Sequence, residues 1–414
     1  MKTSTTFFTL RSLLLGFGFM TWVSACKPTG EPTEVKPTLG ALMAEKLEDT
    51  LRNRGVGYAF AIYEKEQIVA KGAGGIRSNV ADAEGEKPFT TNTKLHIASM
   101  TKTLTTMAFL KAAAQKNIRL TDFIAPYLPA SWAKGSGIQN ITFQHLLTHR
   151  SGIVGLGINC QNGAFNENIY TGLKQLIAKG VFGQGSYCYQ NANFGLFRVL
   201  IPSILGYKFT GNDATDDVQT RELYLAFLQR EIFDKVGIAN VTPAPTAGDI
   251  TYTYNFPIAQ NQRGWNPGNF AATVGAYGIY LSANDAAKIY AYAFNASPPA
   301  ILTTEQTNTL LGENLGSFQA SSTLGTFYYH DGWWYSALTS SGQGLRTLWI
   351  KLPNNLTCVL FVNALQWRVN SLVLPFNNGN IVGFVYNAYA QALQKRNMRV
   401  EAIPPLHIEY PESH

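Results

Sequence analysis

Ser99-Met-Thr-Lys102 begins a long helical pattern that continues as Leu104-Thr-Thr-Met-Ala-Phe-Leu-Lys-Ala-Ala-Ala-Gln115. Because residues three apart share a helix face, the Lys102 amine can reach the Ser99 hydroxyl. A serine becomes a strong nucleophile only when a base takes its proton, and lysine can be that base when burial or a nearby cation lowers its proton affinity. A helix start also directs free backbone N–H groups toward negative charge. The stretch therefore predicts a site suited to acyl transfer.

Two more short patterns follow along the chain. Tyr189-Gln-Asn191 is the only Tyr-x-Asn, and His330-Asp-Gly332 is the only His-x-Gly. The three patterns in this order resemble the serine β-lactamase and penicillin-binding-protein superfamily. The resemblance is strongest to the branch of class C β-lactamases, D-alanyl-D-alanine carboxypeptidases and related esterases, and it covers about residues 39–395. The segment Ile141–Ile153 is similar to the one that lies between the first two motifs in that branch.

The resemblance implies a role for each motif residue. Ser99 is expected to be the nucleophile that forms an acyl-enzyme, and Lys102 to take or relay its proton. Tyr189 is expected to complete the proton path to the leaving group. A phenolate there needs nearby cations, a role suited to Lys102 and His330.

The remaining motif residues are expected to bind or support the substrate. Asn191 has an amide that both donates and accepts, and it is expected to hold Lys102 and a substrate carbonyl. His330 stands where β-lactamases have lysine, and Gly332 allows a close approach of backbone to ligand. The backbone N–H of Trp333, together with that of Ser99, is the predicted oxyanion hole.

The third motif also guides the expected substrate. Asp331 is expected to repel a substrate carboxylate, and the indoles of Trp333 and Trp334 suggest an apolar acyl or leaving group. We therefore favour an ester- or D-amino-acid-amide-cleaving hydrolase acting on a small molecule or peptide, without a cofactor. A true class C-type β-lactamase and a non-hydrolytic lipoprotein that binds peptidoglycan or β-lactams are the alternatives.

A metal-dependent hydrolase is a rival because His145 and His149 have the spacing that places two imidazoles on one helix face. The glutamate that a zinc protease uses as its base does not follow His145, and no obvious third ligand is present. We therefore expect no metal site and assign His149 a structural role.

The first 38 residues predict export and attachment to a membrane. Residues 1–25 form a signal peptide, with Lys2 and Arg11 before an apolar stretch. Val23-Ser-Ala-Cys26 resembles a bacterial lipobox, which implies lipidation of Cys26, whereas plain secretion would need only small residues there. Residues 26–38 are polar and proline-rich, which is typical of a flexible tether. The expected location is the bacterial cell envelope, lipid-anchored at the outer membrane or facing the periplasm.

Composition and cysteine usage set further limits. A net charge of +7 over 414 residues, without a Lys/Arg run interleaved with aromatics, gives no indication of nucleic-acid binding. Cys160 and Cys188 flank predicted active-site loops, and in an oxidising compartment they form a disulfide that fixes the Tyr189 loop or remain two free thiols. Cys358 lies in an apolar run and is expected to be a buried strand residue.

The hydrophobic patterns place strands at both ends of the chain. A helix is expected over Leu39–Arg54, strands over residues 57–63 and 67–72, later strands near 326–337, 344–352 and 355–363, and a last helix near 380–395. Residues from about 103 to 320 form a mostly helical insertion. Residues 39–414 are therefore expected to form one α+β domain of the β-lactamase/transpeptidase-like type, in which both ends of the chain build one antiparallel sheet flanked by helices.

Overall fold

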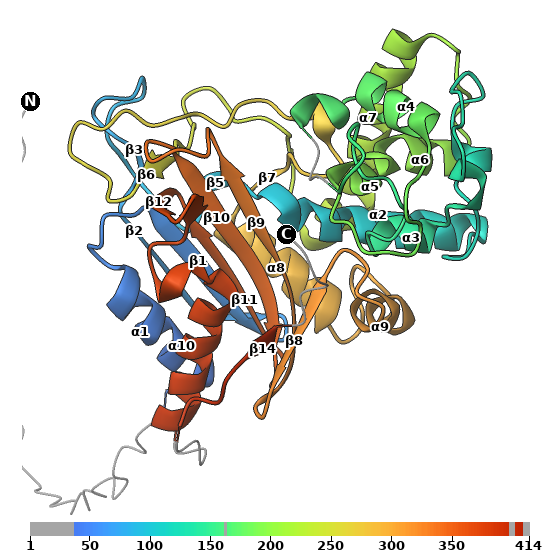
Figure 1. Ribbon diagram of the computed structural model, residues 1–414. Helices are drawn as coiled ribbons and strands as arrows, with labels where there is room; N and C mark the ends of the chain where they lie inside the picture. The colour runs from blue at the N-terminus through green and yellow to red at the C-terminus, as the bar shows by residue number, and fades with distance from the viewer. Residues whose placement is uncertain (1–36, 161–163, 397–401, 409–414) are drawn as a thin grey trace, which may run out of the picture. The chain divides into compact units, whose positions relative to one another are not determined.

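The central sheet joins the two ends of the chain (Figure 1). The structure, a computed structural model, describes residues 37–160, 164–396 and 402–408. Strands β1 (Tyr58–Glu64) and β2 (Gln67–Gly74) form a hairpin, and β1 pairs on its other side with β11 (Leu356–Val362). Strands β10 (Gly344–Leu352) and β9 (Gly325–Tyr335) follow, and all these pairings are antiparallel. The predicted α+β fold, with a sheet built from both ends, is confirmed.

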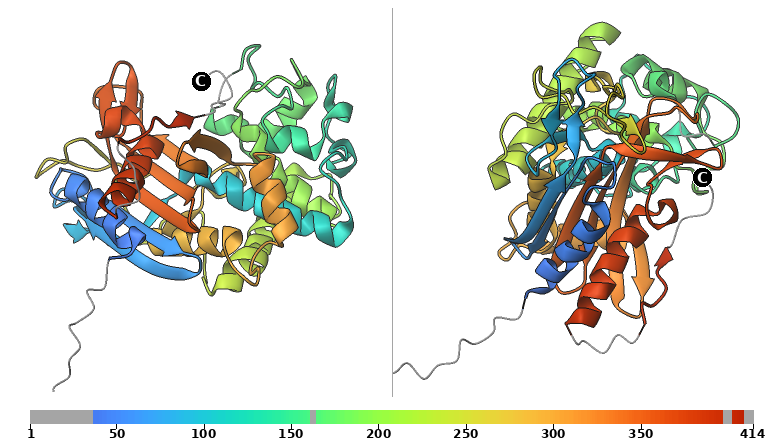
Figure 2. Two further views of the ribbon diagram at one scale, coloured as in Figure 1. Left: turned by 90° about the horizontal axis from the view of Figure 1, so that it is seen from below. Right: turned by 90° about the vertical axis from the view of Figure 1, so that its left-hand side faces the viewer.

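Both faces of the sheet are covered, which gives three layers (Figure 2). Along β1, Phe60 and Ile62 face a core shared with helices α1 (Leu39–Leu51) and α10 (Ile381–Lys395). The alternate residues Ala59 and Ala61 face a second core, which includes helix α8 (Ala283–Phe294). Since successive side chains of a strand point to opposite faces, a strand buried on both faces has no polar alternation.

The residues between the two parts of the sheet contain most of the helices. Helix α2 (Thr101–Lys116) is buried along most of its length and packs on α6 and α7. The other helices of this region are α3 (Phe143–Leu147), α4 (Tyr170–Lys179), α5 (Asn191–Gly195), α6 (Phe197–Ile204), α7 (Asp213–Leu228) and α9 (Thr304–Gly312). Short helical turns are η1 (Ala98–Met100), η2 (Ala125–Tyr127), η3 (Ile138–Asn140), η4 (Phe165–Glu167), η5 (Gln229–Phe233), η6 (Asp234–Val236), η7 (Ala271–Thr273) and η8 (Asn377–Gly379).

The region expected to be a helical insertion contributes to the body of the fold. Helix α8 packs on β1, β10 and β11, and β7 (Tyr280–Ser282) pairs with β5 (Lys94–His96) just before Ser99. Strand β8 (Phe318–Ser322) pairs with β9, so the C-terminal strands begin earlier than the sequence predicted. The other short strands are β3 (Ile76–Ser78), β4 (Lys87–Pro88), β6 (Tyr254–Asn255), β12 (Ala364–Arg368), β13 (Ser371–Val373) and β14 (His407–Ile408).

Two sequence predictions concern residues near the ends of the fold. Cys358 is fully buried in β11 with a free thiol, as expected. The predicted signal peptide, the lipidated Cys26 and the tether up to residue 36 lie outside the described residues. Within the described ranges, no helix combines the length and apolar character needed to cross a bilayer.

Candidate active site

Ser99 lies in the helical turn η1, which continues directly into α2. The residue before it, Ala98, has a φ of 46°, in the left-handed region that residues other than glycine rarely adopt. Such strained backbone persists only where the surrounding structure fixes it, and it is frequent at active sites. The structure places Ser99 at the start of a helix, as the sequence predicted.

Two hydroxyl groups fix the backbone on either side of Ser99. Thr347 Oγ1, from β10, donates to the carbonyl of Ile97 at 2.9 Å. Tyr290 OH, from α8, donates to the carbonyl of Met100 at 2.9 Å. The sheet and its covering helix thus both hold the turn in place.

Lys102 is fully buried beside the serine. Its Nζ lies 2.9 Å from Ser99 Oγ, 2.7 Å from Asn191 Oδ1 and 3.0 Å from the carbonyl oxygen of Ala276. Burial lowers the pKa of Lys102 well below its usual value, which favours the neutral amine. A neutral amine has two N–H groups and one lone pair. Because the amide and carbonyl oxygens accept the two N–H groups, the lone pair is left for the serine proton.

Tyr189 completes the group around the serine. Its hydroxyl donates to Ser99 Oγ at 2.9 Å, and Lys102 Nζ lies 4.9 Å from the centre of its ring. Burial raises the pKa of Tyr189, so the phenol keeps its proton. Burial lowers the pKa of His330 to about 4. His330 therefore carries no charge at neutral pH, so of the two cations expected beside Tyr189 only Lys102 can supply one, once it has taken the serine proton.

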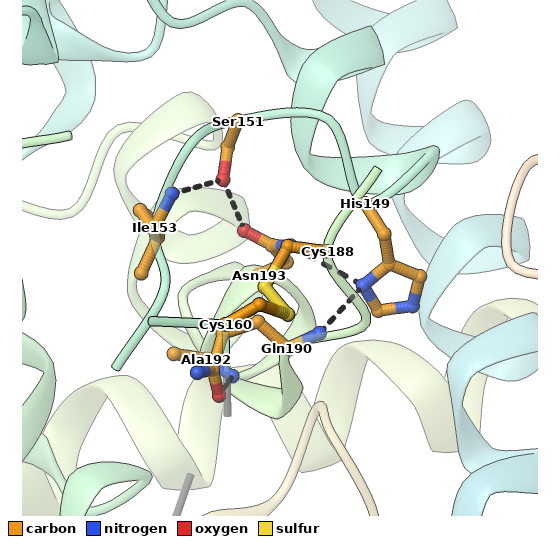
Figure 3. The surroundings of a disulfide bond; sticks show 8 residues. All are labelled: His149, Ser151, Ile153, Cys160, Cys188, Gln190, Ala192 and Asn193. Atoms are coloured by element: carbon orange, nitrogen blue, oxygen red, sulfur yellow. Dashed lines mark hydrogen bonds between the residues drawn. A yellow bond between two sulfur atoms is a disulfide. The ribbon is translucent and has the colours of Figure 1, made fainter. Parts of the chain in front are cut away.

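His149 holds the backbone on both sides of Tyr189 (Figure 3). Its carbonyl accepts from Cys188 N at 2.8 Å, and its Nδ1 accepts from Gln190 N at 3.1 Å. The rings of His149 and Tyr189 lie 4.4 Å apart. The sequence assigned His149 a structural role, but not the segment that it supports, because that contact joins residues 41 positions apart. A histidine inside a segment that resembles the family was the one available signal.

A disulfide joins Cys160 to Cys188, the residue directly before Tyr189 (Figure 3). The two residues are 28 positions apart in sequence. Of the two alternatives that the sequence left open, the structure has the disulfide. It therefore anchors the Tyr189 segment to a second loop, in addition to the contacts made by His149.

Strand β9 runs past the serine turn with one face toward it. A Cβ atom added to Gly332 would lie 2.5 Å from the carbonyl oxygen of Ile97 and 2.2 Å from Thr347 Oγ1. Only glycine fits at this distance. Because side chains alternate along a strand, His330 and Trp334 share this face, and Asp331 and Trp333 occupy the other.

This alternation changes the setting of two residues that were expected to guide the choice of substrate. Asp331 lies on the face away from the serine and forms a salt bridge to Arg346 at 3.0 Å, while its charge still acts on Lys102 and Tyr189. Trp334 packs against Phe270 and Tyr277, with ring centres 5.2 and 4.8 Å apart. Since Trp333 lies on the opposite face, the two indoles do not form one apolar wall.

The rival metal site does not have the helical geometry that its spacing suggested. Helix α3 ends at Leu147, and His149 has a φ of 57°, so His145 and His149 do not share a helix face. The Nδ1 atom of His145 accepts from Thr142 N at 3.2 Å. Within the described ranges, no group of three or more His, Cys, Asp or Glu side chains is placed to hold a metal ion.

A cavity of about 130 Å³ lies beside His330. It is lined by residues 147–150 and 316–319 together with Tyr187, Glu313, Asn314 and His330. Of the motif residues only His330 lines this cavity, and Ser99, Lys102 and Tyr189 are not among its lining residues.

Comparisons with known proteins agree with this geometry. A family model described as Beta-lactamase matches residues 40–375. FmtA from Staphylococcus aureus is similar with a TM-score of 0.61 and 16% identity, over 86% of this chain and 89% of that one. A beta-lactamase/D-alanine carboxypeptidase from Yersinia pestis is similar with a TM-score of 0.59 and 17% identity, over 86% of this chain and 98% of that one. A D-stereospecific amidohydrolase from Streptomyces sp. is similar with a TM-score of 0.57 and 18% identity, over 84% of this chain and 98% of that one. No curated protein matches the sequence.

At these sequence identities the solved structures establish only the fold of this chain. The family model covers most of the chain, and it therefore establishes the family to which the chain belongs. The chain therefore belongs to the beta-lactamase family, within the superfamily of serine β-lactamases and penicillin-binding proteins.

Proposed function

We propose that this protein is a serine hydrolase that works through an acyl-enzyme on ester or amide substrates of the D-amino-acid or peptidoglycan type. The observation that carries the proposal is that Ser99 Oγ lies 2.9 Å from both Lys102 Nζ and Tyr189 OH. Two of the similar structures, a D-stereospecific amidohydrolase and a beta-lactamase/D-alanine carboxypeptidase, support this substrate class.

The contacts of Ser99 with Lys102 and Tyr189 support the following sequence of proton transfers. Ser99 Oγ attacks the substrate carbonyl carbon while its proton passes to the Lys102 lone pair. The backbone N–H groups of Ser99 and Trp333 are proposed to stabilise the oxyanion. The bond between the acyl carbon and the leaving atom then breaks, Tyr189 gives its proton to that atom, and Tyr189 is reprotonated from Lys102. In the second half, water attacks the acyl carbon, its proton returns through the same groups, and Ser99 is released.

The first experiment tests the nucleophile. Ser99→Ala is expected to abolish hydrolysis of p-nitrophenyl acetate and covalent labelling by a fluorophosphonate probe. Ser131→Ala is the matched control, because Ser131 also lies three residues before a lysine, yet Lys134 Nζ is bonded to the carbonyls of Pro129 and Trp132. Retained turnover in Ser99→Ala would overturn the proposal.

The same assays separate the two alternatives. Nitrocefin hydrolysis faster than aryl-ester hydrolysis would favour a class C-type β-lactamase, which the family match makes the nearest rival. Labelling of Ser99 without turnover would favour a protein that binds peptidoglycan fragments or β-lactams without hydrolysing them.

We also propose that the protein is anchored to the bacterial cell envelope by a lipid on Cys26. The supporting observation is the sequence Val23-Ser-Ala-Cys26 after an apolar stretch. Cys26→Ala is expected to move the protein from the membrane fraction to the soluble fraction and to remove metabolic labelling by a fatty-acid analogue. Unchanged fractionation would contradict the anchor.

A further inference from the structure

A buried chain of polar side chains ends at the segment that carries Tyr189 (Figure 3). Ser151 and Asn193 are fully buried, and His149 is 3% exposed. Ser151 Oγ donates to Asn193 Oδ1 at 2.6 Å, and Asn193 Nδ2 lies 3.2 Å from His149 Nδ1. The same nitrogen of His149 accepts from Gln190 N at 3.1 Å. Because hydrogen bonds are strong in the protein interior, such a network rigidifies the segments that it joins.

The partners of Nδ1 define what the imidazole of His149 does. A backbone N–H such as that of Gln190 can only donate, so Nδ1 must carry a lone pair. Burial lowers the pKa of His149 well below its usual value, which keeps a proton off this lone pair. The amide of Asn193 presents a second donor to the same atom. Since Nε2 has no hydrogen-bond partner among the described residues, the polar role of the ring is confined to Nδ1.

Tyr189 depends on this support because it lies between secondary-structure elements. Residues 187–190 belong to neither a helix nor a strand, and α5 begins only after them. The backbone N–H groups on both sides of Tyr189 instead donate to His149, from Cys188 to its carbonyl and from Gln190 to its ring. The imidazole also packs on the phenol, with ring centres 4.4 Å apart. His149 thus restrains both the backbone and the ring of Tyr189.

The other two residues of the proposed mechanism are held by different contacts. The turn that carries Ser99 is fixed by hydroxyl groups from β10 and α8. Lys102 belongs to helix α2, and its Nζ donates to the carbonyl of Ala276 at 3.0 Å. These contacts do not pass through His149 or Asn193. A change in the buried chain is therefore expected to displace the phenol more than the nucleophile and its base.

We propose that His149 is a positioning residue for the proton donor: with Nδ1 supported by Asn193 and Ser151, it holds the phenol of Tyr189 where it protonates the leaving group. This inference rests on the proposed hydrolase function. In that function the bond from the acyl carbon to the leaving oxygen breaks while the Tyr189 hydroxyl gives its proton to this oxygen. A weakly basic leaving group such as p-nitrophenolate departs with little help from a proton, whereas the more basic phenolate needs it. Loss of the support is therefore expected to slow the phenyl ester more.

The test compares p-nitrophenyl acetate with phenyl acetate, which differ only in the leaving group. The measured quantity is the ratio of their kcat/KM values, because kcat/KM reports acylation and both esters give the same acetyl-enzyme. Tyr189→Phe removes the proton donor and is the reference, expected to raise this ratio at least about tenfold, since a positioned acid contributes about 10²- to 10⁴-fold. His149→Leu keeps an apolar side chain without an acceptor. It is also expected to raise the ratio at least about tenfold, because a misplacement of about 1 Å can cost about 100-fold.

Three further variants separate positioning from support of the fold. His149→Asn is expected to stay near the wild-type ratio, because its Oδ1 takes the place of Nδ1 and asparagine tolerates the φ of 57° at this position. Asn193→Asp turns an acceptor toward Nδ1, so it draws a proton onto this nitrogen, takes the acceptor from Gln190 N and is expected to raise the ratio. Leu360→Ala removes a fully buried side chain from the core shared with α1 and α10, and is expected to lower the Tm without changing the ratio.

Several outcomes would overturn the inference. One is an equal loss of kcat/KM for both esters in His149→Leu, and another is a ratio in His149→Asn as high as in His149→Leu. A ratio raised as much in Leu360→Ala would overturn it too. If His149→Leu does not fold, an unchanged ratio in Asn193→Asp decides against the inference in the same way. A raised ratio in Tyr189→Phe alone would refute only this inference, whereas an unchanged ratio there would also refute the proton path of the proposed function.

Discussion

Lys102 is the residue on which the proposed chemistry depends most directly. Both of its N–H groups have oxygen acceptors and its lone pair faces Ser99. Removing the amine by Lys102→Met is expected to lower kcat/KM for the aryl ester by about 10²- to 10⁴-fold, the usual contribution of a positioned base. Lys102→Arg introduces a cation that offers no lone pair, so it is expected to be equally impaired. Activity in the arginine variant would show that Lys102 acts through its charge.

The same lysine is expected to reduce the stability of the fold. Its folded pKa lies below the value of 10.5 in the unfolded chain, so between these two values the unfolded state binds a proton that the folded state lacks. Stability contributed by this group therefore rises with pH up to about 10.5. Lys102→Met is expected to raise the Tm at pH 7, measured by thermal unfolding, and an unchanged or lower Tm would contradict the burial argument.

Strand β9 and the turn η1 act as one unit because Gly332 lets them touch. The added methyl group of Gly332→Ala would lie 2.2 Å from Thr347 Oγ1 and 2.5 Å from the carbonyl oxygen of Ile97, so the strand must move away from the serine. We expect esterase activity to fall at least about 100-fold, as for loss of an oxyanion donor. Gly312→Ala is the matched control, because no atom lies within 4 Å of the added Cβ. Near-normal kcat in Gly332→Ala would refute the close approach.

The disulfide links two loops rather than two core elements. Loss of a cross-link that spans 28 residues is expected to cost about 3 to 4 kcal/mol of unfolding free energy. Because His149 independently holds Cys188 N and Gln190 N, we expect kcat of the Cys160→Ser/Cys188→Ser double variant to fall less than tenfold. Denaturant unfolding and ester hydrolysis measure the two effects. A larger loss of kcat at unchanged stability would give the disulfide the main positioning role.

The fold as a unit depends on pairing strands from distant parts of the chain. Strand β1 contacts β11 along its whole length, from Tyr58 opposite Val362 to Glu64 opposite Leu356. Such non-local pairings leave the N-terminal hairpin with one uncovered edge until the C-terminal strands arrive. We expect a fragment that ends at residue 320 to show no cooperative thermal unfolding by circular dichroism. Independent folding of that fragment would show that the helical region is a separate domain.

The sequence predicted the individual strands and the closeness of Ser99 and Lys102, because both features depend on local spacing. The Ser99–Lys102 pair is set by three residues of helix, and the alternation in β9, β10 and β11 is visible in their buried residues. The errors share a different cause. The burial that neutralises His330 and the partner of Asp331 depend on neighbours far along the chain, and no local pattern encodes them. The same holds for α8, whose helical pattern does not say which face of the sheet it covers.

The buried thiol of Cys358 can be used to measure how often the central sheet opens. It is fully enclosed in β11, and burial raises its pKa, so an alkylating reagent reaches a reactive thiolate only when the strand separates from its neighbours. In a Cys26→Ala background with the disulfide intact, no other thiol among the described residues competes for the reagent. The rate of maleimide incorporation under native conditions therefore reports how often the middle of the sheet is breached, without any denaturant.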